Sequence, residues 1–213
     1  KAALKNKKIL CEKPISMNLE ETIKAREIVK KYKVKFFEAI AYRSHPQTKT
    51  IFELIKSNQF GKIKKIEARF GFKVKRIRPD SRLFNKKLGG GSILDLGCYP
   101  SSMSILIASL KSHFKKVEVK DKKLDYYKTG VDINSFATLN FDNGFVSYIG
   151  TSFQNNLGKK TVIKGEDGTI KIEDTWHGEP SKIFVEGKYN EVFNIDSNKS
   201  IYAYEIEKFS ENI

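Results

Sequence analysis

The spacing of apolar segments in the first 42 residues constrains the fold most strongly. Residues 8–11 predict a short buried strand that ends before Pro14, because proline has no N–H for a strand ladder. Asn18 then fits a helix N-cap, with Glu21 as its capping-box partner. A second apolar segment follows at residues 34–42. Strand, helix and strand at this spacing predict a βαβ unit with parallel strands, and two strands alone cannot bury both faces of such a sheet.

The rest of the chain predicts a different architecture. His45-Pro46 opens a second helix, and the alternating segment 62–74 predicts a half-buried strand. A helix is expected over 93–110 and another over 201–213. Antiparallel strands are expected at 116–122, 133–141, 145–153, 160–164 and 169–173. The sequence therefore predicts a parallel α/β portion followed by a larger α+β portion built on a mostly antiparallel sheet.

The formal net charge of +15 raises the question of a nucleic-acid partner. Only six of the 40 basic residues are arginine, the residue type of bidentate phosphate and base recognition, and the lysines are scattered along the chain. We therefore expect a lysine-rich, solvated surface and no nucleic-acid partner. A charge-driven nucleic-acid binder remains a rival interpretation.

The cysteine, histidine and apolar patterns argue against several further classes of protein. Cys11 and Cys98 do not make a disulfide framework, and the three histidines lie far apart with no CxxC or HExxH, so no metal site is expected. No apolar run approaches the length of a membrane span, and the N-terminus lacks a secretory segment. We expect a cytoplasmic protein without a membrane partner.

Two segments carry residues with chemical potential. Lys13 follows a buried strand, where α/β sheets bind ligands, but in a chain this rich in lysine its position alone favours an exposed strand-end lysine without function. Asp95 and Tyr99 lie four residues apart behind three glycines, on one side of a helix. A nearby ammonium would lower the pKa of a tyrosine, so a Lys–Tyr pair could transfer a proton to or from an alcohol or carbonyl. The alternative is a glycine turn with a capping Asp95 and a core Tyr99.

Five motifs, in order, carry a family resemblance: CEKP at 11–14, FEAIAYRSHPQ at 37–47, GGGSILDLGCYP at 89–100, VDINSFATLNFDNG at 131–144 and GEDGTIKIEDTW at 165–176. The combination resembles the glucose–fructose oxidoreductase/inositol dehydrogenase (Gfo/Idh/MocA) family, in particular its dihydrodiol and xylose dehydrogenase branch. The resemblance implies an NAD- or NADP-dependent oxidoreductase that acts on a sugar or a related small alcohol. It also implies that Tyr99 is the general acid/base, with Lys13 as its electrostatic partner and Asp95 in the substrate pocket. The wider implied set is Glu12, Lys13, Pro14 and Arg43 for the cofactor, and Asp95, His45 and Arg82 for the substrate.

The resemblance also implies a domain organisation. Residues 1–43 would be the end of a Rossmann-type nucleotide-binding domain, and residues 44–213 an α+β domain with an open-faced sheet. The family's glycine-rich dinucleotide fingerprint would precede Lys1, so the chain is expected to be a fragment. Family members commonly pair through the open sheet face, which predicts a homo-oligomer. A non-catalytic binding or scaffold protein on the same fold, or an inactive truncated fragment, remains the alternative.

Overall fold

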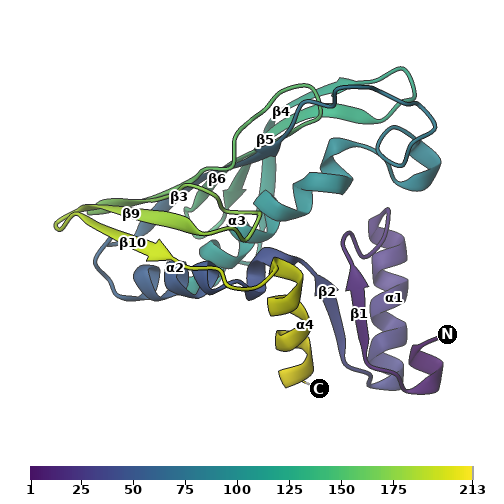
Figure 1. Ribbon diagram of the computed structural model, residues 1–213, viewed down its shortest axis with the longest axis horizontal. Helices are drawn as coiled ribbons and strands as arrows, with labels where there is room; N and C mark the ends of the chain where they lie inside the picture. Colours follow the sequence, from purple (N-terminus) through teal and green to yellow (C-terminus); the bar gives the residue numbers. More distant parts are fainter. Residues whose placement is uncertain (213) are drawn as a thin grey trace.

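A computed structural model describes residues 1–212; Ile213, the last residue of the predicted final helix, lies outside the described residues. The chain begins with a 3-10 turn, η1 (Ala3–Lys5), followed by β1 (Ile9–Glu12), α1 (Leu19–Tyr32) and β2 (Phe36–Ala39). Strands β1 and β2 pair in parallel, from Ile9 opposite Phe36 to Glu12 opposite Ala39. The predicted βαβ unit is therefore confirmed, and Figure 1 shows it beside the larger part of the molecule.

Side-chain capping explains where α1 begins. Asn18 Oδ1 accepts a hydrogen bond of 2.9 Å from the Glu21 N–H, as the capping-box spacing predicts. The carboxylate of Glu21 accepts instead from the N–H of Met17, one residue earlier than an ideal capping box. Ile23 and Ile28 on this helix remain 45% and 48% exposed. The two-stranded sheet thus covers only part of the apolar surface of α1.

The second strand is shorter than its apolar sequence suggests. We expected extended backbone over 34–42, but β2 ends at Ala39 and the 3-10 turn η2 (Ala41–Ser44) follows. Tyr42 in this turn is 1% exposed, and its hydroxyl is 2.7 Å from Ser102 Oγ. Burial of Tyr42 against another helix therefore competes with continuation of the strand.

The second sheet has eight strands in the order β10-β9-β8-β7-β3-β6-β5-β4. Every pairing is antiparallel except that of β3 with β6. The strands are β3 (Ile63–Gly71), β4 (Val117–Tyr126), β5 (Asp132–Phe141), β6 (Val146–Ser152), β7 (Thr161–Gly165), β8 (Gly168–Ile172), β9 (Ser181–Gly187) and β10 (Glu191–Ile195). The expected α+β class with a large, mostly antiparallel sheet is confirmed. Sequence analysis did not predict β9 and β10, although burial alternates along the first five residues of β9.

Helices cover one face of this sheet. Figure 1 shows α2 (Pro46–Lys56) and α3 (Cys98–Lys111) on the same side, with α4 (Ile201–Glu211) between the large sheet and the βαβ unit. The core lies beneath α2 and α3, where Ile51, Ile55, Ile66 and Met103 are fully buried. The ring of Phe209 on α4 packs edge-on against Phe37 of β2, with ring centroids 5.5 Å apart. Helix α4 therefore bridges the two sheets.

The segment 86–110 has the length and the mean hydropathy, 1.4, of a membrane-crossing helix. It is built from several pieces: the 3-10 turn η3 (Lys86–Leu88), a glycine turn, the π-helix η4 (Ile93–Gly97) and α3. Met103 and Ile107 are buried in the core, and Ser104 Oγ lies 2.6 Å from Ser147 Oγ of β6. We therefore interpret α3 as a core helix of this fold. The helix predicted over 93–110 begins with a π-helical turn, a feature that is frequent at functional sites.

Candidate functional site

The structure brings Lys13 and Asp95 together from segments 82 residues apart. Lys13 Nζ donates to the main-chain oxygen of Asp95 at 2.5 Å and lies 3.3 Å from its Oδ1. Arg82 Nη1 donates to the same Oδ1 at 2.8 Å. The Lys13 and Asp95 side chains are 15% and 10% exposed, whereas that of Arg82 is 66% exposed. Asp95 is thus a shielded carboxylate with two cationic partners, and the contact joins the βαβ unit to the π-helical turn.

Tyr99 lies against this ion pair. The ammonium of Lys13 is 5.4 Å from the centroid of the Tyr99 ring. That ring also packs against Tyr42, Phe70 and Trp176 at centroid distances of 6.0, 5.2 and 6.0 Å. We call these four residues the aromatic cluster. Tyr42 and Trp176 are buried, whereas Phe70 and Tyr99 are partly exposed, so the cluster presents an apolar surface beside the charged pair.

The pKa of Tyr99 differs from the expectation that a nearby ammonium would lower it. Burial raises the pKa of this phenol, and the neighbouring Cys98, Tyr202, Glu12 and Asp95 act in the same direction. No hydrogen bond to the Tyr99 hydroxyl is found within residues 1–212. The phenol is therefore protonated at neutral pH, and in this structure it is a weaker acid than a free tyrosine.

The three glycines before the π-helix have steric causes. Gly89 has a φ of +71° and Gly91 a φ of +118°, which favour glycine. A Cβ on Gly90 would lie within 2.9 Å of three main-chain oxygens, and one on Gly91 would collide with Oδ1 of Asp132. Asp132 Oδ2 in turn accepts from Ser92 Oγ at 2.7 Å and from the N–H of Ile93 at 2.9 Å. The glycines let the chain approach Asp132, which anchors the start of the turn that carries Asp95.

Substitution of Gly91 by alanine should destabilise the protein, because the Cβ would collide with Asp132 and the positive φ would be strained. We expect a loss of about 2 kcal/mol or more in the free energy of unfolding, measured by urea denaturation. Gly97→Ala is the matched control, since a Cβ there meets its nearest atom at 3.5 Å. Equal effects of the two substitutions would contradict the steric explanation.

The other expected cofactor residues surround the carboxyl ends of the two parallel strands. Glu12 is exposed, and its carboxylate accepts from the N–H of Lys13 at 3.2 Å. The Lys13–Pro14 peptide bond is cis, and the N–H of Ile15 donates to Glu38 Oε1 of β2 at 2.9 Å. Arg43 lies on η2 with an exposed side chain. Only Lys13 of the expected cofactor set directly contacts Asp95.

His45, which was expected near the substrate, lies at the N-cap of α2. It is 3% exposed, and its Nδ1 caps α2 by accepting from the N–H of Gln47 at 3.3 Å. Burial lowers the pKa of this imidazole. Its ring packs edge-on against Tyr204 of α4, with centroids 5.2 Å apart. Within residues 1–212, no hydrogen bond, ion pair or ring contact joins His45 to Lys13, Asp95 or Tyr99.

Sequence analysis did not identify Glu205 on α4. Its side chain is buried, and burial together with the negative charge of Glu12 raises its pKa to about 7. No hydrogen bond or ion pair of Glu205 is found among the described residues. Glu12 also raises the pKa of Tyr99, so Glu205 belongs to the electrostatic surroundings of the site. Glu205 stands among apolar and charged residues of α4, and this pattern alone does not indicate that its carboxyl group is buried.

The pKa of Glu205 is higher in the folded chain than in the unfolded chain, where it is about 4.3. The protonated side chain therefore stabilises the fold fully at low pH, and this contribution to the free energy of unfolding is lost as pH rises through 7. Glu205→Gln should therefore be more stable than the parent at pH 8, by about 1 to 3 kcal/mol, and nearly equal to it at pH 4.5. Urea denaturation at both pH values measures the difference. Glu211→Gln on the same helix is the exposed control, and a pH-independent effect of Glu205→Gln would contradict the prediction.

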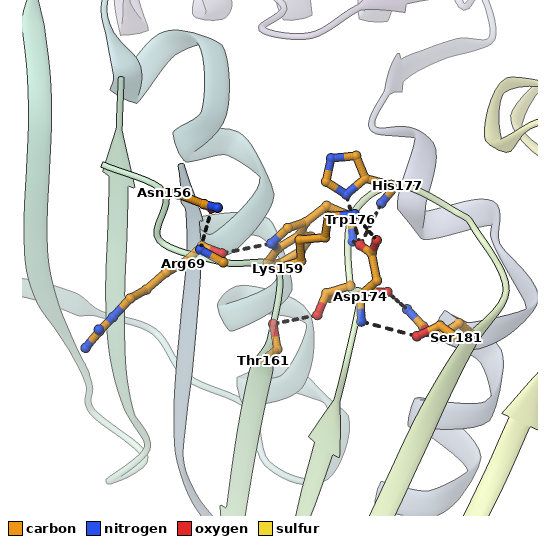
Figure 2. Close-up of polar contacts among 11 residues, drawn as sticks. Arg69, Asn156, Lys159, Thr161, Asp174, Trp176, His177 and Ser181 are labelled. Atoms are coloured by element: carbon orange, nitrogen blue, oxygen red, sulfur yellow. Dashed lines mark hydrogen bonds and ion pairs between the residues drawn. The ribbon is translucent and has the colours of Figure 1, made fainter. Parts of the chain in front are cut away.

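A second polar group lies on the loop between β8 and β9 (Figure 2). Asp174 accepts from His177 Nδ1 and from Lys159 Nζ, each at 2.9 Å, and its main-chain N–H donates to Ser181 Oγ. The indole N–H of Trp176 donates to the main-chain oxygen of Arg69 at 2.9 Å. These bonds fix the loop that supplies Trp176 to the aromatic cluster.

An apolar groove of about 400 Å³ lies beside the charged pair. It runs between η4, α3 and strands β4 to β6, and its lining includes Pro14, Cys98 and Leu124. Ligand sites combine apolar walls with a few placed polar groups. The groove is mostly apolar, and Lys13, Asp95 and Tyr99 are not among its lining residues, although their chain neighbours Pro14, Leu94 and Cys98 are.

Comparison with known proteins gives a family match for residues 48–171, which correspond to the GFO/IDH/MocA C-terminal domain. A trans-1,2-dihydrobenzene-1,2-diol dehydrogenase of Xenopus tropicalis is 30% identical over 183 residues, which cover 85% of this chain and 53% of that protein. A D-xylose 1-dehydrogenase (NADP(+)) of Haloferax volcanii is 27% identical over 173 residues, which cover 81% of this chain and 51% of that protein. The chain thus spans about half the length of these relatives.

Solved structures show the same fold. A 3-ketoreductase from Actinomadura kijaniata, in complex with NADP and TDP-benzene, superposes with a TM-score of 0.84 at 18% identity over 100% of this chain and 64% of that one. An aldose-aldose oxidoreductase from Caulobacter crescentus, complexed with glycerol, gives a TM-score of 0.81 at 18% identity over 99% of this chain and 63% of that one. At this identity the likeness supports the fold class, and the family resemblance expected from the motifs is confirmed by the match over residues 48–171.

Proposed function

The chain belongs to the GFO/IDH/MocA family, and from this premise we propose that it is the substrate-binding and catalytic portion of an NAD- or NADP-dependent oxidoreductase. The reaction class is hydride transfer between a nicotinamide and the carbinol or carbonyl carbon of a sugar or related small alcohol. The observation that carries the proposal is the meeting of Lys13, Asp95 and Tyr99 from two distant segments. A proton donor, a cation and a carboxylate at one place match the groups that alcohol–carbonyl chemistry requires.

Each of these residues has a distinct proposed role. Tyr99 donates its proton to the carbonyl oxygen in reduction, and in oxidation its phenolate form takes the proton of the hydroxyl. The Lys13 ammonium, 5.4 Å from the centroid of the Tyr99 ring, is the cation beside that phenolate. Asp95 binds its two cations through Oδ1, which leaves Oδ2 to accept a hydrogen bond from a substrate hydroxyl. Arg82 holds Asp95 from the exposed side. Lys13 uses two of its three N–H donors on Asp95 and has one for a ligand.

The residues at the end of β1 fit the reactive end of a nicotinamide cofactor. Glu12, Lys13 and Pro14 lie at the carboxyl end of a parallel strand, the usual ligand edge of such sheets. When bound, NAD or NADP would accept or supply the hydride. Lys13 would orient the carbonyl oxygen with its remaining N–H, and Arg43 would lie at the pocket wall. The given sequence contains no GxGxxG turn, the motif that binds the pyrophosphate of a dinucleotide. The proposed contacts of this chain with the cofactor are therefore those at the nicotinamide end.

Steady-state assays of the full-length protein test this proposal. Purified enzyme is mixed with NAD⁺ or NADP⁺ and with D-xylose or trans-cyclohexane-1,2-diol, and the absorbance of the reduced nicotinamide is followed. We expect turnover with at least one pair. Cofactor binding by calorimetry without turnover on either substrate would favour a non-catalytic protein on the same fold.

The remaining parts of the proposal concern organisation. Residues 1–43 would close the nucleotide-binding domain, and residues 44–213 would form the substrate-binding domain. The sheet face opposite α2 and α3 presents Phe136, Tyr148 and Phe184 among charged side chains, and pairing of two copies there would make a homo-oligomer. Cys11 and Cys98 are not joined in a disulfide, which fits a reducing, cytoplasmic location.

A further inference from the structure

A second charged pair, Asp174 and His177, lies at the edge of the aromatic cluster. Asp174 Oδ1 accepts from His177 Nδ1 at 2.9 Å and from the main-chain N–H groups of Trp176 and His177 at 3.2 Å. Its Oδ2 accepts from Lys159 Nζ at 2.9 Å. Burial alone would raise the pKa of Asp174, but the hydrogen bonds from His177 and Lys159 outweigh burial and lower the pKa. Asp174 is thus an ionised carboxylate that holds one nitrogen of the imidazole.

The second nitrogen of His177 has no such partner. Figure 2 shows Nδ1 turned to Asp174 and the opposite edge of the imidazole ring turned away from it. The side chain is 40% exposed, and no hydrogen bond to Nε2 is found among residues 1–212. A histidine whose Nδ1–H is held by a carboxylate presents Nε2 as an acceptor when neutral and as a donor when charged. The ring is therefore oriented for contact with a ligand.

One aromatic ring separates His177 from Tyr99. The ring of Phe70 contacts His177 edge-on at 5.3 Å and Tyr99 edge-on at 5.2 Å, centroid to centroid. Trp176, the chain neighbour of His177, contacts both Phe70 and Tyr99. Phe70 is partly exposed, so a small molecule can lie on it between the two polar side chains.

We propose that His177, oriented by Asp174, binds a second hydroxyl group of the substrate whose reacting hydroxyl meets Tyr99. The inference rests on the proposed oxidoreductase function and assigns one residue of that site, His177, as the group that distinguishes a substrate with a second hydroxyl from one without it. His177 determines specificity, and Asp174 is a positioning residue. A site built to hydrogen-bond a hydroxyl discriminates strongly against analogues that lack it, because its polar group is then left unpaired.

The test compares matched substrates on the full-length enzyme. Trans-cyclohexane-1,2-diol is paired with cyclohexanol, and D-xylose with 2-deoxy-D-xylose. We expect His177→Ala to lower kcat/KM by about 10-fold or more for the diol and for D-xylose, and by less than about 3-fold for their deoxy partners. His177→Gln, whose amide reaches the position of Nε2, should restore part of the preference. Asp174→Asn should weaken the same preference with a smaller effect.

Controls separate this inference from the proposed function. His113→Ala, at an exposed histidine after α3, should leave both ratios unchanged. Thermal unfolding of each variant identifies losses of activity that come from misfolding. Misfolding would lower kcat/KM equally for all four substrates. Suppose that the parent enzyme turns over and that His177→Ala lowers kcat/KM equally for both members of each pair. That result would overturn the role of His177 and leave the proposed function intact. No turnover by the parent on any diol or sugar would overturn the inference together with the proposed function.

Discussion

Replacement of Tyr99 by phenylalanine should lower turnover by about 100-fold or more, the scale of a lost general acid, while the fold stays intact. The substitution keeps the ring that packs against Phe70 and Trp176 and removes only the hydroxyl. Because that hydroxyl has no hydrogen-bond partner within residues 1–212, its loss leaves no buried group unpaired. Steady-state kinetics of the full-length protein, with thermal unfolding alongside, measures both parts of the prediction.

Tyr42→Phe is the matched control, because it removes a hydroxyl from the neighbouring ring of the same cluster. The Tyr42 hydroxyl is buried and lies 2.7 Å from Ser102 Oγ, so its removal should cost about 1 kcal/mol of stability and change turnover little. The two variants should thus show opposite patterns. Turnover near the parent value in Tyr99→Phe would remove Tyr99 from the chemistry and leave it as a packing residue.

The raised pKa of Tyr99 adds a pH criterion. A buried phenol that stays protonated can donate its proton throughout the neutral range, so the rate of carbonyl reduction should not decline between about pH 6 and 9 through ionisation of this group. A decline in that window would have to come from another group, such as Glu205, whose pKa is about 7. Profiles of Glu205→Gln distinguish the two.

Local sequence signals predicted much of the fold. The parallel pairing of β1 with β2 followed from strand, helix and strand spacing, and the Asn18 cap from a single motif. Burial overrode local propensity at residues 40–42, where Tyr42 turns into the core instead of continuing the strand. The parallel pairing of β3 with β6 was beyond prediction, because no local pattern records which strands become neighbours.

The candidate site was predictable in part for the same reason. Lys13, Asp95 and Tyr99 stand in short motifs at a strand end and a helix start, and the structure brings them into contact. His45 also stood in a motif, yet its ring is used to cap α2. The buried acid Glu205 depends on how α4 packs against η2, a tertiary contact that leaves no trace in spacing.

Removal of the Lys13 ammonium should lower turnover as strongly as loss of the Tyr99 hydroxyl, by about 100-fold, and should also destabilise the fold. Lys13→Met keeps most of the packing volume and removes both hydrogen bonds to Asp95. The carboxylate, 10% exposed, would then keep one cationic partner, Arg82, and the loss of charged hydrogen bonds to a shielded carboxylate costs about 1 to 3 kcal/mol.

Combination with Asp95→Asn separates the structural from the chemical part of this effect. In the double variant the carboxylate that lost its Lys13 partner is replaced by a neutral amide, so the free energy of unfolding should recover toward the parent value. Turnover should not recover, because the ammonium that orients the carbonyl oxygen and the carboxylate that binds the substrate are both gone. Recovery of both quantities together would mean that Lys13 and Asp95 serve only to join the βαβ unit to η4. An unchanged kcat with a raised KM for the nicotinamide in Lys13→Met would make Lys13 a cofactor-binding residue and leave proton transfer to Tyr99 alone.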